Sequence, residues 1–136
     1  MLQYTLAYAA TAGAFLAIDF VWLNYAAANL YRPQLGAILL ETPNLVVAGL
    51  FYLLYAAAIV VLAIVPAHNN GSVLLAFGLG AVLGVAAYGT YDITNLATLK
   101  GWSVTVTVID IAWGALLTAV SATVGFLVLN AVARGG

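Results

Sequence analysis

The chain has 136 residues, of which 66% are hydrophobic, and it carries only three basic and four acidic side chains. About a quarter of the residues of a water-soluble domain are charged, so this composition and the mean hydropathy of +1.15 predict an integral membrane protein. Three scattered basic residues exclude a nucleic-acid-binding face, and with no cysteine and a single histidine we expect no metal centre and no cofactor.

Four apolar segments predict four transmembrane helices, at about residues 4–28, 44–65, 73–99 and 102–131. Each segment exceeds the ~20 residues that cross a hydrocarbon core. Thr42-Pro43 and Ser72 are typical of helix starts, and Pro66 is expected to end the second span. The expected fold class is therefore an all-α membrane protein, a four-transmembrane-helix bundle that forms one domain over residues 1–136.

The connection between the first two spans, residues 29–41, is too apolar for a free loop and too short to cross the membrane. Pro33 is expected to end the first helix. Apolar residues then follow at helical spacing, which predicts a short interfacial helix between spans one and two. The residues that we expect to anchor the chain at the lipid headgroups are Arg32, Glu41, Lys100 and Trp102.

The connection between the third and fourth spans is only Lys100-Gly101, so these two helices are predicted to be antiparallel neighbours. Gly80 and Gly84 in the third span form a small-xxx-small pair, which favours close helix packing. Arg32 and Lys100 lie on the same predicted side of the membrane, and the positive-inside rule favours the cytoplasm for that side.

Three aspartates lie inside predicted spans, and helix geometry brings them to one depth. Asp92 lies nine residues before Gly101 and Asp110 lies nine residues after it, so both are expected about 13 Å from that turn. Asp19 reaches the same level near the end of the first span, and Tyr52 joins it from the second. The spacing therefore predicts an acidic layer within the membrane.

An ionised aspartate at this depth costs about 2.5–3.5 kcal/mol. Arg32 would have to fold back to reach the layer, so the acids are expected to be protonated, bonded to neutral donors, or paired with a bound cation. An Asp-x-x-Trp pair occurs twice, and residues three or four apart share a helix face. The candidate residues for binding a cation or small molecule are Asp92, Asp110, Asp19, Asn95, Tyr88, Tyr52, Trp22 and Trp113.

Residues 88–102, YGTYDITNLATLKGW, resemble the hallmark of a bacterial membrane-protein family, domain of unknown function DUF2177. Residues 19–23, 31–36 and 108–114 are similar to its other motifs, so the resemblance covers nearly the whole chain. It implies a four-helix protein of the bacterial inner (cytoplasmic) membrane, and it implies no reaction or substrate.

The acidic layer favours a small transporter or permease-like protein that binds protons or a cation. One alternative is an accessory or assembly subunit of a larger membrane complex, in which the acids are structural polar contacts. An intramembrane enzyme acting on lipid is less favoured, because no nucleophile–base pair or phosphate loop is evident, and we assign no catalytic residue. The expected partners are the lipid bilayer, a second copy of the chain or a larger complex, and a small ligand.

Overall fold

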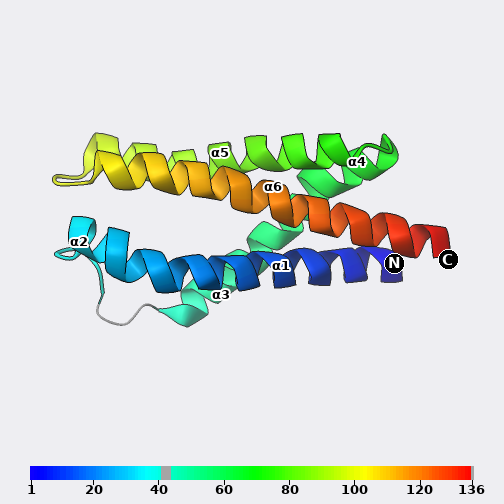
Figure 1. Cartoon of the computed structure of the whole chain (residues 1–136), viewed down its shortest axis with the longest axis horizontal. Helices are drawn as coiled ribbons and strands as arrows, with labels where there is room; N and C mark the ends of the chain where they lie inside the picture. The colour runs from blue at the N-terminus through cyan, green and yellow to red at the C-terminus, as the bar shows by residue number, and fades with distance from the viewer. Residues whose placement is uncertain (41–43, 136) are drawn as a thin grey trace.

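The computed structural model describes residues 1–40 and 44–135, which form four long helical spans and no strand. Each span is long and apolar enough to cross a membrane, as predicted. The first consists of α1 (Leu2–Ala26), η1 (Ala27–Tyr31) and α2 (Arg32–Leu35), and the second of α3 (Leu45–Ile59), η2 (Val60–Ile64) and α4 (Val65–Asn69). The third and fourth are α5 (Val73–Thr98) and α6 (Val104–Gly135) (Figure 1).

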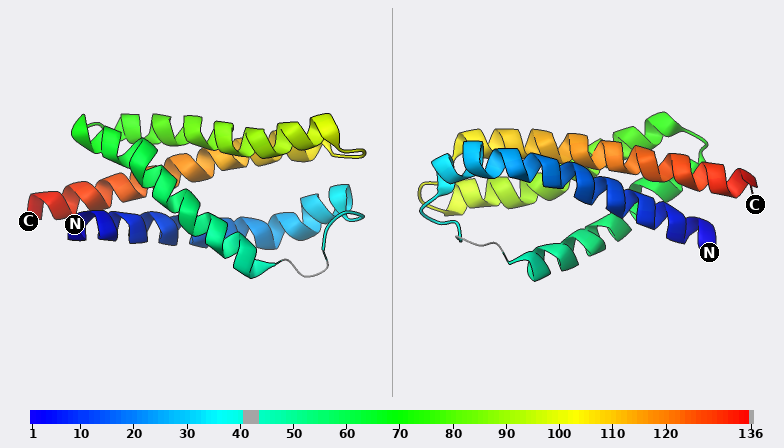
Figure 2. Two further views of the ribbon diagram at one scale, coloured as in Figure 1. Left: turned by 180° about the vertical axis from the view of Figure 1, so that it is seen from behind. Right: turned by 60° about the horizontal axis from the view of Figure 1, so that its bottom comes forward.

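Helices α5 and α6 form an antiparallel hairpin, which confirms the prediction from their short connection. Helix α1 packs against the other side of α6, and the second span crosses the bundle obliquely (Figures 1 and 2). Both termini lie at the end that holds the α4–α5 turn, and α2 and the α5–α6 turn lie at the opposite end. The spans therefore alternate in direction, as four membrane crossings require.

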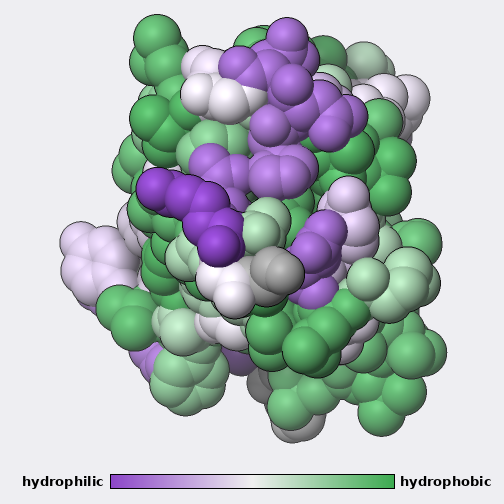
Figure 3. Space-filling view, turned by 90° about the vertical axis from the view of Figure 1, so that its right-hand side faces the viewer, coloured by the Kyte–Doolittle hydropathy of each residue, from purple (hydrophilic) through white to green (hydrophobic). Residues whose placement is uncertain are grey.

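Polar and apolar side chains are distributed over the surface of the bundle as expected for a membrane protein. At the end that holds both termini, hydrophilic groups gather within a hydrophobic rim (Figure 3). Along the spans, large apolar side chains such as Leu50, Leu74 and Val82 are exposed. Such a surface is stable when lipid chains cover the sides and water meets the ends.

Two prolines lie inside helical spans without ending them, which corrects the prediction for both. Pro33 and Pro66 are each the second residue after a π-helical turn, η1 and η2 respectively. The amide groups of Arg32 and Val65 bond to the carbonyls of residues five positions earlier. Because a π turn widens the helix, the backbone accommodates a ring that has no N–H, and the helix continues.

No separate interfacial helix follows Pro33 among the described residues, which corrects that part of the prediction: α2 continues the first span directly and ends at Leu35. Residues 36–39 then form turns and a bend. The predicted helix start at Thr42-Pro43 and the headgroup residue Glu41 lie outside the described residues. Asn44 caps α3, because its Oδ1 accepts a bond of 3.1 Å from the Val47 amide. Ser72 caps α5 in the same way, as predicted.

Close packing of α5 on α6 depends on Gly80 and Gly84, as the small-xxx-small pattern predicts. A Cβ at Gly80 would lie 2.9 Å from the Thr118 carbonyl oxygen, and one at Gly84 would lie 2.7 Å from the Ala115 Cα. Gly78, two residues before Gly80 and therefore on the other face of α5, has open space around it. The two buried glycines let the backbones meet, and this hairpin forms the rigid wall against which the other spans pack.

Candidate functional site

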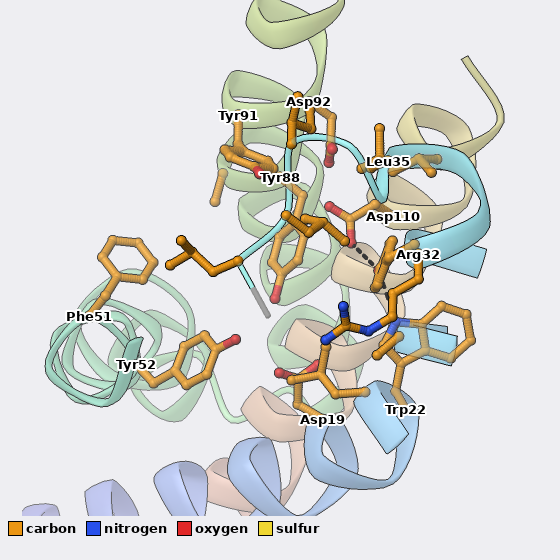
Figure 4. Close-up of a pocket in the computed structure, with 18 of the residues that line it drawn as sticks. Asp19, Trp22, Arg32, Leu35, Phe51, Tyr52, Tyr88, Tyr91, Asp92 and Asp110 are labelled. Atoms are coloured by element: carbon orange, nitrogen blue, oxygen red, sulfur yellow. Dashed lines mark hydrogen bonds between the residues drawn. The ribbon is translucent and has the colours of Figure 1, made fainter. Parts of the chain in front are cut away.

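A cavity of about 680 Å³ lies between the spans, in the half of the bundle that contains α2. All three membrane aspartates line it, one each from α1, α5 and α6 (Figure 4). Nearly half of the remaining wall residues are aromatic: Phe15, Trp22, Tyr31, Phe51, Tyr52, Tyr55, Tyr88, Tyr91 and Trp102. The acidic layer expected from spacing therefore surrounds one cavity.

The cavity exists because the second span lies obliquely. Helix α3 packs against α1, whereas the second span packs against α5 mainly through η2 and α4. Toward its first residue α3 diverges from the α5–α6 hairpin (Figure 2). Aromatic rings rather than direct helix–helix contacts bridge part of the resulting gap. Phe15 lies 5.4 Å from both Tyr52 and Tyr55, centroid to centroid, and Tyr55 lies 6.3 Å from Tyr88.

A glycine on α6 positions one of these rings. Tyr88 lies directly over Gly114, where any side chain would collide with the tyrosine ring. The hydroxyl groups of Tyr88 and Tyr52 both point into the cavity, toward the side on which Asp19 lies (Figure 4). Phenol groups from α5 and α3 and a carboxyl group from α1 thus converge in the centre of the bundle.

The two Asp-x-x-Trp pairs are crossed between helices. Trp113 of α6 donates its indole N–H to Asp19 of α1, over 3.1 Å. Trp22 of α1 donates to the Tyr31 hydroxyl over 3.0 Å, and that hydroxyl donates to Asp110 Oδ1 of α6 over 2.8 Å. The two indoles stack with centroids 4.6 Å apart. Each tryptophan therefore supports the aspartate of the other helix, which ties α1 to α6.

We expect Tyr31→Phe to lower the free energy of unfolding by about 1–3 kcal/mol, because the ring remains while Trp22 and Asp110 both lose their hydrogen-bond partner. Tyr25→Phe is the matched control, since Tyr25 is 63% exposed on the same span and we expect almost no change. Unfolding of the purified variants in detergent measures both. Equal stability of the two variants would show that the crossed network contributes nothing.

Asp92 differs from the other two aspartates. It is fully buried on α5, with a relative exposure of 0%, and no hydrogen bond to either carboxyl oxygen is found among the described residues. Its carboxyl group and that of Asp110 point toward each other in the cavity (Figure 4). A buried polar group without a hydrogen-bond partner costs free energy. Asp92 is therefore the aspartate whose hydrogen-bonding capacity the protein itself satisfies least.

Arg32 also lines the cavity, which corrects the prediction that it lies out of reach of the acids. Its guanidinium group is directed inward, on the side of Asp19 (Figure 4). The reason is η1: because the first span continues through Pro33, Tyr31, Arg32 and Leu35 stay on the helix and line the cavity. Tyr31 was missed for the same reason, since an early helix end would place it at the interface.

The other predicted residues lie around this centre. Asn95 is half-buried on α5, outside the cavity wall. Trp113 reaches Asp19 from behind the wall. Lys100 is exposed in the turn, as a headgroup anchor would be. Trp102 is buried instead, lines the cavity and packs edge-on against Tyr91 at 5.6 Å.

The comparisons with known proteins give one finding. A family model described as "predicted membrane protein (DUF2177)" matches residues 4–127. The chain belongs to this family. Comparison with curated proteins and with solved structures yields no match. The match and the four apolar spans together establish this DUF2177 protein as an integral membrane protein in contact with the lipid bilayer.

The matched region of this DUF2177 protein contains every residue of the cavity wall, from Phe15 to Asp110. The family description names a membrane protein and no activity. Its function therefore has to be argued from the chemistry of the cavity.

Proposed function

We propose that this DUF2177 protein binds an organic cation in its cavity and acts as a small transporter for that cation. The observation that carries the proposal is Asp92, a fully buried carboxyl group with no hydrogen-bond partner among the described residues, on the wall of a cavity of about 680 Å³. A cationic ligand would supply the missing partner.

The spacing of the acids favours a molecule over a metal ion. Within the described part of the chain, no three His, Cys, Asp or Glu side chains converge closely enough to hold a metal ion. Asp19, Asp92 and Asp110 nevertheless line the same cavity. Its volume is in the range of ~300–1,000 Å³ that is typical of small-molecule sites. A ligand that interacts with all three of these acids must therefore be larger than a single ion.

The aromatic wall favours a cation with an apolar surface. Tyr52 and Tyr88 present rings and hydroxyl groups to the cavity from two spans. Aromatic faces attract organic ammonium groups by about 0.5–2 kcal/mol each, more when the site is desolvated. Carboxyl groups supply charge and the rings supply shape, which together suit a substituted ammonium group carried on a hydrophobic body.

The position of the cavity supports transport rather than surface binding. It lies among the transmembrane spans, and Tyr31 of the π turn η1 is part of its wall. Substrate sites of transporters are typically formed where transmembrane helices depart from regular geometry, and π turns occur frequently at functional sites.

We expect the purified protein to bind benzyltrimethylammonium saturably, and Asp92→Asn to weaken that binding by about tenfold or more, which corresponds to the loss of one buried charge interaction. Calorimetry in detergent measures both. The matched control ligand is neopentylbenzene, in which carbon replaces the charged nitrogen, and its binding should not change in the variant. Equal affinity of wild type and variant for the cation would refute the proposal. Uptake into proteoliposomes then tests transport separately.

A structural role is the second candidate, and the crossed network favours it for two of the acids. Asp19 and Asp110 each accept a hydrogen bond from a donor across the α1–α6 contact. Such bonds hold membrane helices in register, as expected of an accessory or assembly subunit. Asp92 has no such partner among the described residues, so this candidate leaves the least satisfied residue of the site without a role.

A further inference from the structure

We infer that Asp92 and Asp110 share one proton in the ligand-free protein and release it when the organic cation binds. This inference rests on the proposed function, because it concerns the same cavity. It adds that occupancy of the cavity is coupled to the movement of a proton, one for each cation.

The geometry of the pair carries the inference. The two carboxyl groups face each other across the cavity wall (Figure 4). Asp110 uses Oδ1 to accept the bond from Tyr31, and its other oxygen lies on the side of Asp92. Two ionised carboxylates in this arrangement would repel within the membrane. A shared proton removes one negative charge, and it gives the buried Asp92 the hydrogen-bond partner that it lacks among the described residues.

The groups that face the pair come from every element packed around it: Asp19 of α1, Tyr31 of η1, Arg32 of α2, Tyr52 of α3, and Tyr88 and Tyr91 of α5. Tyr31 already donates its hydroxyl proton to Asp110. Asp19 accepts from Trp113 and lies with Arg32 on the other side of the cavity. We therefore assign the shared proton to Asp92 and Asp110 alone.

The exchange balances in charge. Before binding, the pair holds one proton and one negative charge. When a monovalent cation enters between the pair and the aromatic wall, the proton leaves for the aqueous phase and the pair carries two negative charges. The cation adds one positive charge, so the net charge of the cavity is unchanged. Binding of a cation and release of a proton thus form one electroneutral exchange.

The test uses benzyltrimethylammonium, whose charge does not depend on pH. Calorimetry at one pH in two buffers of different ionisation enthalpy counts the protons released on binding. We expect about one proton per cation, and an affinity that rises up to about tenfold per pH unit while the pair is protonated. Asp110→Asn should abolish most of the release, because a neutral amide donates to Asp92 without a shared proton. Asp19→Asn should weaken binding and retain the release.

The outcomes separate this inference from the proposed function. If the wild-type protein does not bind the cation at all, the proposed function is wrong and the exchange falls with it. If the cation binds without proton release, or if Asp110→Asn releases as many protons as the wild type, the exchange is wrong while the proposed function stands.

Discussion

An Asp92→Leu variant is expected to be more stable than the wild-type protein and to bind no organic cation. Leucine has a side chain of the same branched shape, somewhat larger, and needs no hydrogen bond, whereas Asp92 is fully buried and has no partner for either oxygen among the described residues. Replacing buried ionic groups by well-packed apolar side chains stabilises some proteins by about 1–4 kcal/mol, and Asp110, which loses the shared proton in this variant, keeps the hydrogen bond from Tyr31. Unfolding in mixed detergent, with ligand binding measured in parallel, detects both changes.

The matched control is Asp19→Leu. Asp19 is also buried and lines the same cavity, but it accepts a hydrogen bond from the indole of Trp113. This replacement leaves the indole without its acceptor and is expected to destabilise the protein by about 1–3 kcal/mol. Opposite signs for the two variants would identify Asp92 as a residue kept for binding. If Asp92→Leu were destabilised as well, the acids would be structural contacts, and the proposed site would lose its central residue.

A Gly84→Leu variant is expected to lose roughly 3 kcal/mol or more, enough to separate the α5–α6 hairpin. Even a Cβ at this position would lie 2.7 Å from the Ala115 Cα, and backbone cannot move aside as a flexible side chain can. The cavity depends on the same contact, because Asp92 and Asp110 are carried by these two helices. Ligand binding should therefore be lost together with stability.

Gly78→Leu is the control for this variant. Gly78 is on the same helix, and a Cβ there meets nothing within 4 Å. In a membrane-facing helix the added side chain only enlarges the apolar surface, so stability should be unchanged or slightly higher. The comparison is made by thermal unfolding in detergent. Similar losses in both variants would mean that the loss of stability does not come from the contact between α5 and α6.

Much of the fold could be predicted from sequence because hydrocarbon imposes a simple rule on the chain. Every backbone polar group must be satisfied within the membrane, so four apolar segments of sufficient length had to form helices. The two-residue link Lys100-Gly101 left α5 and α6 only an antiparallel arrangement. The small-xxx-small pair at Gly80 and Gly84 pointed to the close contact that the structure shows.

The prolines show where local rules failed. Pro33 and Pro66 were expected to end helices, as they do in a regular α-helix. A π turn before each one removes the conflict with the preceding turn, and nothing in the composition of residues 27–31 or 60–64 signals it. The error mattered for the site, because the continuation of the first span carries Tyr31 and Arg32 to the cavity wall.

Sequence alone determined that the chain spans a membrane four times and carries three aspartates to one depth, since both follow from the fixed rise and the hydrophobic length of a helix. The rotation and tilt of each helix depend on contacts between residues far apart in sequence. Only the tertiary structure therefore decided that α3 diverges to leave a cavity. It also decided that each tryptophan is hydrogen-bonded, directly or through Tyr31, to the aspartate of the other helix. The same contacts leave Asp92, among the described residues, without a partner of its own.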